Sequence, residues 1–225
     1  MSYYNGPKIV TNGLLACLDA GNSKSYVGSG TTWTDISYNS LNGTLTNTPT
    51  FTGSFGGGFY FNGTNQYVTT PSFSLTGPYT IIVAAKSATS TWNDYGILCS
   101  RRVNSGFVLH PQQSTKDVTC YFTDSAGSSL YGGNLTPADI TINHVYAMST
   151  NGSNIHYGYL DDTKPVSNTT AITTGTSTGQ AYLAKDSGLS RYGNVTIYEC
   201  LIYNRQLTDG EYLQTYNALK TRFGL

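Results

Sequence analysis

Charged residues are scarce in this chain of 225 amino acids, and neither sign is in excess. Twelve Lys and Arg residues balance twelve Asp and Glu residues, so the formal net charge is zero. Long charged helices and coiled coils need many more such residues. A nucleic-acid-binding protein usually carries a basic surplus that neutralises phosphates. The composition therefore argues against both classes, and we expect no nucleic-acid partner.

The chain also lacks long hydrophobic runs and closely spaced cysteines. Its longest apolar stretch, around Ile81 to Ala85, is far too short to span a bilayer. The N-terminal segment has neither the basic region nor the apolar core of a secretory signal, so we expect no export and no membrane partner. Cysteines occur at positions 17, 99, 120 and 200 without a C-x-x-C pair, which argues against zinc and favours buried, reduced thiols.

The residues that are abundant predict short β-strands joined by tight turns. Thr, Ser, Asn and Gly fill 99 of the 225 positions, while 19 Tyr, 8 Phe and 2 Trp supply apolar mass for a core. Apolar residues alternate with polar ones in many short runs, which is the period of a strand. A hairpin turn is expected at Asn151 to Asn154. The expected strands cover residues 14–19, 58–61, 67–70, 79–86, 95–100, 107–110, 118–123, 144–150, 155–160, 181–185 and 195–203.

One segment near the C-terminus has a helical period instead. Apolar residues at 212, 216, 219 and 223 fall on one helical face. Thr208 and Glu211 have the spacing of a capping box, and Gly224 follows as a stop signal. We therefore predict a helix over residues 209–223. The expected fold is all-β, with an N-terminal arm over residues 1–12 and a single β-sandwich domain over residues 13–225 that includes this short C-terminal α-helix.

Six segments in order along the chain form a familiar set: GLLACLDAGN (13–22), WTDIS (33–37), NGTL (42–45), FYFNGTNQYV (59–68), HVYAMSTNG (144–152) and IYECLIYNRQL (197–207). Together they resemble concanavalin A-like, laminin-G-type jelly-roll domains. The opening and the closing helix are most similar to stand-alone domains in virion proteins of tailed bacteriophages. The resemblance implies a concanavalin A-like β-sandwich. It also implies a non-enzymatic virion subunit that is made in the host cytoplasm and is oligomeric in its assembly. Such a subunit would be either a capsid decoration (cement) protein or a tail-associated surface protein.

The related glucanases raise the question of catalysis. Retaining glycosidases need two carboxyl groups about 5 Å apart, usually on alternate residues of one strand. The chain has only two glutamates: Glu199 has no acidic neighbour two residues away, and Glu211 belongs to the helix cap. Asp161 and Asp162 would point to opposite faces of a strand and fit a turn better. We therefore expect no enzymatic activity.

Calcium is the metal that relatives with this fold often hold. It takes about six to eight oxygen ligands, and no run of closely spaced acidic residues supplies them here. The stretch from Asp19 to Asn22 could contribute oxygens, but an Asx turn explains it more simply. We expect no cofactor, with calcium as the alternative.

The alternative function is carbohydrate binding, for recognition of a host-surface glycan. Such a site needs a flat aromatic ring with polar groups beside it. The loop that contains Trp92, Asn93, Asp94 and Tyr95, together with Arg101, has these groups. The other interpretation is that Trp92 covers the edge of the sandwich as a buried lid.

The N-terminal arm is the predicted contact with other virion proteins. It precedes the first strand and carries Tyr3, Tyr4 and the rigid Pro7. A cement protein must bury more than about 1,000 Å² against its neighbours. Deleting residues 2–7 should therefore weaken attachment to the virion and leave the sandwich folded.

Overall fold

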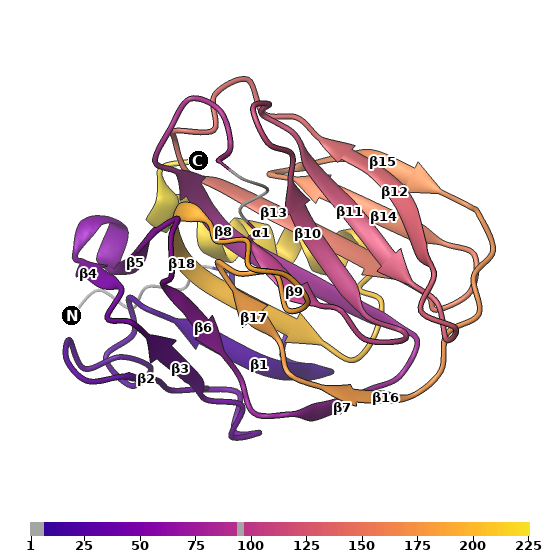
Figure 1. Ribbon diagram of the computed structural model, residues 1–225, viewed down its shortest axis with the longest axis horizontal. Helices are drawn as coiled ribbons and strands as arrows, with labels where there is room; N and C mark the ends of the chain where they lie inside the picture. The colour runs from indigo at the N-terminus through magenta and orange to yellow at the C-terminus, as the bar shows by residue number, and fades with distance from the viewer. Residues whose placement is uncertain (1–6, 94–96) are drawn as a thin grey trace.

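The chain folds as two facing antiparallel sheets with one helix on the outside, as the computed structural model shows for residues 7–93 and 97–225 (Figure 1). This confirms the predicted all-β sandwich with a short C-terminal helix. In spatial order, sheet A contains β15 (Thr163–Asn168), β14 (His156–Leu160), β13 (His144–Thr150), β8 (Tyr79–Ser87), β18 (Asn194–Tyr203), β5 (Gly58–Asn62) and β4 (Thr50–Thr52), and β1 (Leu14–Asp19) also pairs with β18.

Sheet B forms the second layer, and a small third sheet adjoins it. In spatial order, sheet B contains β12 (Ser129–Leu135), β11 (Val118–Thr123), β10 (Phe107–Pro111), β9 (Cys99–Arg101), β17 (Tyr182–Leu183), β6 (Tyr67–Thr69), β3 (Gly43–Thr46) and β2 (Thr32–Trp33). Sheet C pairs β16 (Ser177–Gly179) with β7 (Phe73–Leu75).

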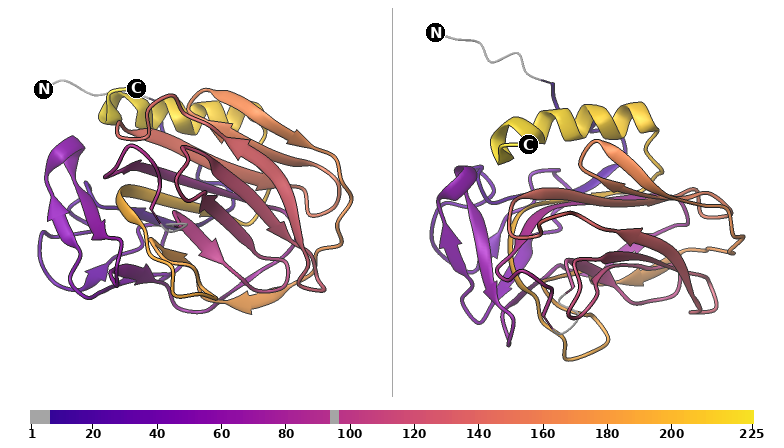
Figure 2. Two further views of the ribbon diagram at one scale, coloured as in Figure 1. Left: turned by 45° about the horizontal axis from the view of Figure 1, so that its top comes forward. Right: turned by 90° about the horizontal axis from the view of Figure 1, so that it is seen from above.

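Sheet A is buried on both faces because helix α1 (Asp209–Phe223) covers its outer side (Figure 2). Along β8, Ile81 and Val83 point into the core between the sheets, whereas Ile82 and Ala84 point toward the helix. This two-sided burial explains why β8 is a continuous apolar run and does not alternate. The helix contributes the buried face that its sequence period predicted, namely Tyr212, Tyr216, Leu219 and Phe223.

Helix α1 begins and ends at the predicted signals. The Thr208 hydroxyl accepts a hydrogen bond from the Glu211 N–H at 3.2 Å, and the Glu211 carboxylate accepts one from the Thr208 N–H at 2.9 Å. Gly224 closes the helix with a left-handed φ of 74°. The Arg205 guanidinium, with the Thr208 amide, lowers the pKa of Glu211 to about 2. Neither α1 nor the short 3-10 helix η1 (Ser54–Gly56), the helices of the described residues, is long and apolar enough to cross a membrane.

The turn predicted between β13 and β14 is confirmed. The Asn151 side-chain oxygen accepts hydrogen bonds from the backbone N–H groups of Ser153, Asn154 and Ile155, at 2.9 to 3.0 Å. Gly152 takes a φ of 78°, which few other residues tolerate. The backbone geometry therefore favours glycine at 152, and the side-chain oxygen of Asn151 holds the turn closed.

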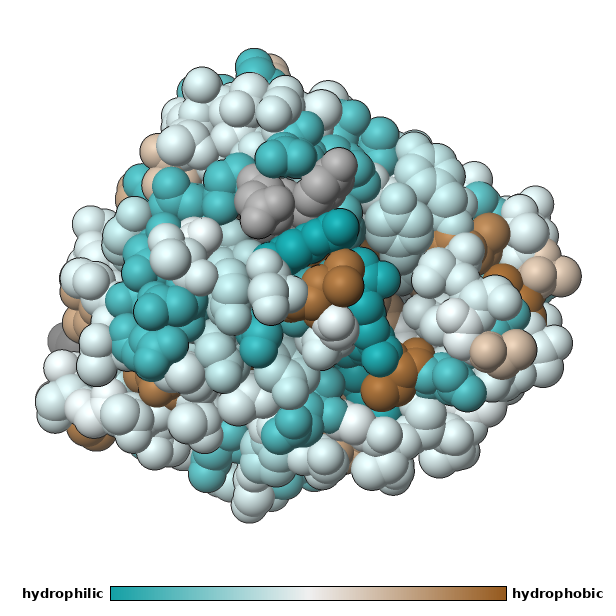
Figure 3. Space-filling view, in the orientation of Figure 1, coloured by the Kyte–Doolittle hydropathy of each residue, from teal (hydrophilic) through white to brown (hydrophobic). Residues whose placement is uncertain are grey.

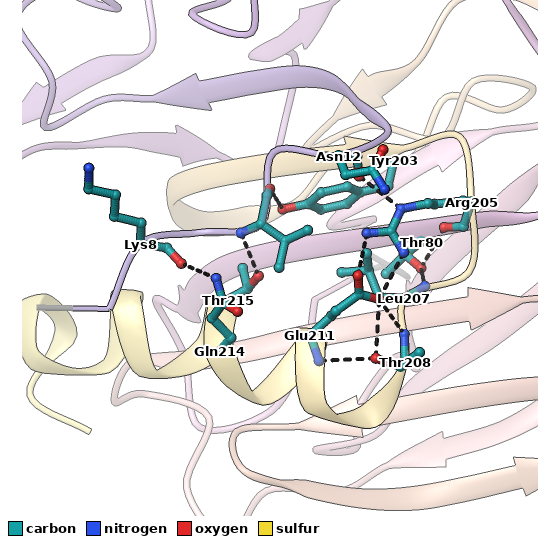
Figure 4. Close-up of polar contacts among 11 residues, drawn as sticks. Lys8, Asn12, Thr80, Tyr203, Arg205, Leu207, Thr208, Glu211, Gln214 and Thr215 are labelled. Carbon is teal, nitrogen blue, oxygen red and sulfur yellow. Dashed lines mark hydrogen bonds and ion pairs between the residues drawn. The ribbon is translucent and has the colours of Figure 1, made fainter.

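The described part of the N-terminal arm is attached to the body of the domain (Figure 4). The Val10 N–H donates to the Thr215 hydroxyl at 3.2 Å, and the Val10 carbonyl accepts from the Tyr203 hydroxyl at 2.9 Å. The carbonyls of Lys8 and Asn12 also accept hydrogen bonds, from side chains of α1 and of the segment that leads into it. The arm from residue 8 onward therefore joins the outer layer that α1 forms over sheet A.

Candidate functional site

A polar trough lies on the outer face of sheet B, opposite the helix layer. It consists of two adjoining hollows of about 330 and 190 Å³ that share Arg102 and Ser129. Figure 3 shows this face, with hydrophilic residues gathered near its hollowed centre. The larger hollow is lined by Arg102, His110, Gln112, Tyr121, Ser129 and Arg191.

Strand alternation places the polar side chains in the trough. Leu109 and Cys120 are paired across β10 and β11 and point into the core between the sheets. Their neighbours His110 and Tyr121 must then point to the outer face, since successive strand residues alternate. The alternation that places Leu109 and Cys120 in the core therefore also places His110 and Tyr121 at the floor of the trough.

A row of hydrogen bonds fixes the orientation of these groups. The Gln112 amide nitrogen lies 3.1 Å from His110 Nδ1 and donates to the Thr119 hydroxyl at 2.8 Å. The Thr119 hydroxyl in turn donates to the Asn134 side-chain oxygen at 2.7 Å. The row crosses three adjacent strands, so its polar atoms are held in place before any ligand arrives.

The loop between β17 and β18, residues 184–193, forms one wall of the trough. It stands in front of sheet B in Figure 2, right, on the side away from the helix. Arg102 Nε lies 2.7 Å from both carboxylate oxygens of Asp186, whose side chain is fully buried. The Asp186 N–H donates to the Arg191 carbonyl at 3.0 Å, which closes the loop and sets Arg191 at the rim.

Tyr121 lines the opposite side of the larger hollow, and Tyr131 lies beside it on the next strand. Tyr121 on β11 is paired with Tyr131 on β12, and their ring centroids are 6.0 Å apart at an interplanar angle of 68°. The edge of the His110 ring meets Tyr121 at 5.5 Å. Tyr131 is 52% exposed, so its ring offers an apolar face beside the polar row.

The trough disfavours a positive charge on its own histidine. Burial, followed by the nearby charge of Arg102 and Arg191, lowers the pKa of His110 to about 4. The imidazole is therefore neutral at pH 7. The positively charged side chains that line the trough are therefore Arg102 and Arg191.

The predicted aromatic platform at Trp92 is corrected by the structure. The indole is 2% exposed, its N–H donates to the Lys116 carbonyl at 3.1 Å, and its ring lies 6.2 Å from that of Tyr146. A ring so deeply buried has no face on which a sugar could stack. The buried-lid interpretation agrees with this position.

The prediction that Arg101 binds a glycan is also corrected by the structure. This side chain is fully buried and donates to the carbonyls of Phe73 at 3.2 Å and Ser177 at 2.7 Å. Its guanidinium lies 5.1 Å from the centroid of the Phe73 ring. Arg101 therefore attaches sheet C to sheet B, and the neighbouring Arg102 is the one that lines the trough.

The remaining predicted glycan residues do not form a described site. The Asn93 side chain donates to the Tyr192 carbonyl at 3.0 Å and accepts from the Asn194 N–H at 2.8 Å, so both its polar ends contact backbone. Asp94 and Tyr95 lie outside the described residues. A contact of these residues with a glycan stays a prediction.

The predicted assembly contact is described only at one residue. Pro7 is exposed, whereas Tyr3 and Tyr4 lie outside the described residues. The hydrogen bonds that hold the arm begin at Lys8. A role of residues 2–7 in attachment to a virion stays a prediction.

Two carboxylates that are far apart in sequence lie side by side in sheet A. Asp19 on β1 is the Cα partner of Glu199 on β18, and Arg222 of the helix contacts both side chains. Burial and the charge of Asp19 raise the pKa of Glu199. The search for acidic neighbours along one strand could not find a partner on another strand. This cluster lies beneath the end of α1 and takes no part in the trough.

The Asx turns expected at Asp19 and Asn22 are confirmed. The Asp19 carboxylate accepts from the Gly21 N–H at 2.9 Å, and the Asn22 side chain accepts from the Lys24 N–H at 3.0 Å. Within residues 7–93 and 97–225, no three His, Cys, Asp or Glu side chains gather closely enough to hold a metal ion.

Sequence comparison gives no relatives: no protein-family model matches the chain, and no curated protein matches it significantly. Structural comparison gives many similar folds. Domain 4 of AbnA, a GH43 extracellular arabinanase from Geobacillus stearothermophilus solved with arabinotriose, has a TM-score of 0.69 and 18% identity. The match covers 91% of this chain and 98% of that domain.

Toxin binding domains share the fold as well. That of Paraclostridial Mosquitocidal Protein 1 has a TM-score of 0.68 and 15% identity, over 92% of this chain and 52% of that one. The binding domain of botulinum neurotoxin DC, solved in complex with SialylT, has a TM-score of 0.64 and 12% identity. The match covers 93% of this chain and 52% of the neurotoxin chain. The chain spans about half the length of these toxin domains. At such low identity the likeness establishes the lectin-like β-sandwich fold.

Proposed function

We propose that this chain is a carbohydrate-binding module and that the trough on sheet B is its glycan site. The observation that carries the proposal is the polar lining of the larger hollow, which hydrogen bonds hold in place, with the exposed ring of Tyr131 beside it. Sugars present hydroxyl groups around their edge and C–H groups on their faces. A wall of tyrosine beside ordered donors and acceptors suits both.

The structural comparisons support this proposal over the alternatives. The similar arabinanase domain was solved with arabinotriose, and the similar toxin domain was solved with SialylT. Carbohydrate ligands thus occur on this fold in proteins of unrelated sequence. Glycan binding is the alternative function in the sequence analysis, and we now propose it as the main function.

We also propose that the chain is not a glycosidase. The carboxylate pair in sheet A, Asp19 and Glu199, is held by one arginine, and Glu199 is 4% exposed. No carboxylate is among the described residues that line the trough. A glycosidase of the retaining type needs two accessible carboxyl groups across the scissile bond.

The test of glycan binding uses an array of oligosaccharides, followed by calorimetric titration of the strongest binder. Tyr131→Ala should weaken binding by about tenfold, because exposed tyrosines at binding sites often contribute more than about 1 kcal/mol. Tyr38→Ala is the matched control, since Tyr38 is 92% exposed and lies between β2 and β3, at the opposite end of sheet B from β12. Equal affinity for both variants and the parent protein would contradict the site. An array with no binder would contradict the function.

A place in the virion of a tailed phage stays a prediction from the sequence resemblance. Neither the fold nor the structures named above bear on it. Mass spectrometry of purified virions from an infected host should detect the chain, and its absence from them would exclude this setting.

A further inference from the structure

A second surface cluster lies on sheet B, on the other side of the loop 184–193. We call it the tyrosine patch and define it as Tyr67, Tyr182, Tyr192 and Lys185. The Lys185 ammonium lies 4.2 Å from the ring centroid of Tyr67, 5.3 Å from that of Tyr182 and 5.7 Å from that of Tyr192. The Tyr67 centroid is 6.2 Å from each of the other two. All four side chains are partly exposed.

The patch faces the same side of the sheet as the trough. Val68 and Leu183 are paired across β6 and β17 and point into the core between the sheets. Tyr67 and Tyr182, their sequence neighbours, therefore point outward. In sheet B, β17 lies between β6 and β9, and β9 adjoins β10, so the patch and the trough occupy neighbouring strands (Figure 1).

The loop between the two sites contributes residues to both. Lys185 is bridged to Tyr192, and the next pair inward, Asp186 with Arg191, is joined by a backbone hydrogen bond. Successive residues on such a pair of segments point to opposite sides. One side thus carries Arg191, which lines the trough, and the buried Asp186. The other side gives Lys185 and Tyr192 to the patch.

Three cations line the trough and the patch, although the whole chain has a net charge of zero. The polar row ends at the Asp117 carboxylate, which accepts from the Asn134 amide at 3.0 Å. The described lining of the trough and patch includes Arg102, Arg191 and Lys185, and it includes no carboxylate. Asp186 pairs with Arg102 and is fully buried. The contact of Lys185 with tyrosine rings leaves its charge intact, since a ring carries no net charge.

We propose that the trough and the tyrosine patch form one extended site for an acidic oligosaccharide, in which Lys185 binds an anionic group while the tyrosine rings contact the sugar. This inference rests on the proposed function and deepens it by naming the class of glycan. The ammonium of Lys185 donates up to three hydrogen bonds, and those to a carboxylate or sulfate are stronger than those to a hydroxyl. Arg191 would meet a second anionic group across the loop.

The tyrosines explain why a lysine suits this position. Three rings hold the ammonium on one side, which reduces the entropy that a flexible lysine would lose on binding. The same rings supply apolar faces for the C–H groups of the sugar that carries the acid. The anionic group can be a uronic or sialic carboxylate or a sulfate ester, because both are bound by the same cation.

The test starts with an array of neutral, uronate-bearing, sialylated and sulfated oligosaccharides at about 0.15 M salt. The expected result is that the acidic oligosaccharides bind more tightly than the neutral ones. Comparing the carboxylated with the sulfated oligosaccharides shows which anionic group the site prefers. Binding that is confined to neutral members, or equal for both groups, would overturn this inference and leave the glycan site standing. No binding at all would overturn the proposed function as well.

Calorimetry then locates the anion contact. The acidic oligosaccharide that binds best should lose about tenfold in affinity with Lys185→Gln, which corresponds to one charge-assisted contact. The loss should shrink as salt is raised, because screening weakens a partly exposed ion pair. Lys24→Gln removes an exposed lysine from another loop and should leave affinity unchanged. Equal affinities for the two variants would refute the role of Lys185, provided that both have the circular dichroism spectrum of the parent.

Discussion

Arg101 and Arg102 are neighbours in sequence and have different roles in the structure. Arg101 is fully buried and bonds backbone carbonyls, whereas the next residue, Arg102, pairs with Asp186 at the trough. The sequence gives both residues the same chemistry. Which of them reaches solvent depends on which face of β9 is covered, and that is decided by strands distant in sequence.

We predict that Trp92 contributes to the free energy of unfolding. Its ring is buried and its N–H is satisfied by Lys116, so Trp92→Ala should leave a cavity and cost about 3–5 kcal/mol of unfolding free energy. Urea denaturation measures this cost. Trp92→Phe, which keeps much of the volume, should lose less. An unchanged midpoint for the alanine variant would contradict the burial.

His110 is predicted to make stability depend on pH. Its pKa is about 4 in the folded chain, against 6.5 when unperturbed, so the unfolded state binds the proton more readily. The contribution of this residue is complete above pH 6.5. It is lost as pH falls toward 4, at no more than about 1.4 kcal/mol per pH unit. Unfolding free energies of the parent and of His110→Gln, measured from pH 7 to pH 4, should converge in this window. A constant difference would refute the shift.

At the scale of the element, segments with a regular apolar pattern could be predicted, and segments whose pattern glycine or proline interrupts could not. The strands β1, β11 and β13 and the helix α1 have the predicted bounds. β12 was missed because Gly132 and Gly133 interrupt its pattern, and β15 because it contains Pro165. β15 tolerates proline because it lies at the edge of sheet A, where one side needs no ladder partner. An edge position is a property of the sheet, which the segment alone does not reveal.

The cap of α1 gives a prediction at this scale. Thr208→Ala should lower the unfolding free energy by about 1 kcal/mol, because the hydroxyl that accepts from the Glu211 N–H is removed. Thr208→Ser should retain most of the stability. Glu211 has a lowered pKa, so its contribution is complete above pH 4.5 and is lost as pH falls toward 2. Thermal unfolding of both variants at pH 7 checks the cap, and an unaffected alanine variant would contradict it.

At the scale of the molecule, the fold was predictable and the candidate site was not. Alternation and turn residues predict a sandwich, because the same pattern recurs along nearly all of the chain. The trough instead combines the ends of β9 and β10, the pair β11 and β12, and the loop before β18. Arg102 and Arg191 lie 89 positions apart in the sequence. Their proximity follows from β17 pairing with β9, a long-range contact that no local pattern encodes.

The two sheets differ in how much of their outer faces is accessible to a ligand. Helix α1 and the arm cover the outer face of sheet A, whereas the outer face of sheet B carries the polar row, the exposed tyrosines and the cations. A binding surface on this molecule is therefore best sought on sheet B.

The most direct test is a crystal structure of the protein with the oligosaccharide that binds best on the array. The account predicts sugar density in the trough, in contact with Tyr131 or with the lining residues Gln112 and Tyr121, and extending across the loop 184–193 toward Lys185. Sugar bound elsewhere on the molecule, with the trough empty, would contradict it.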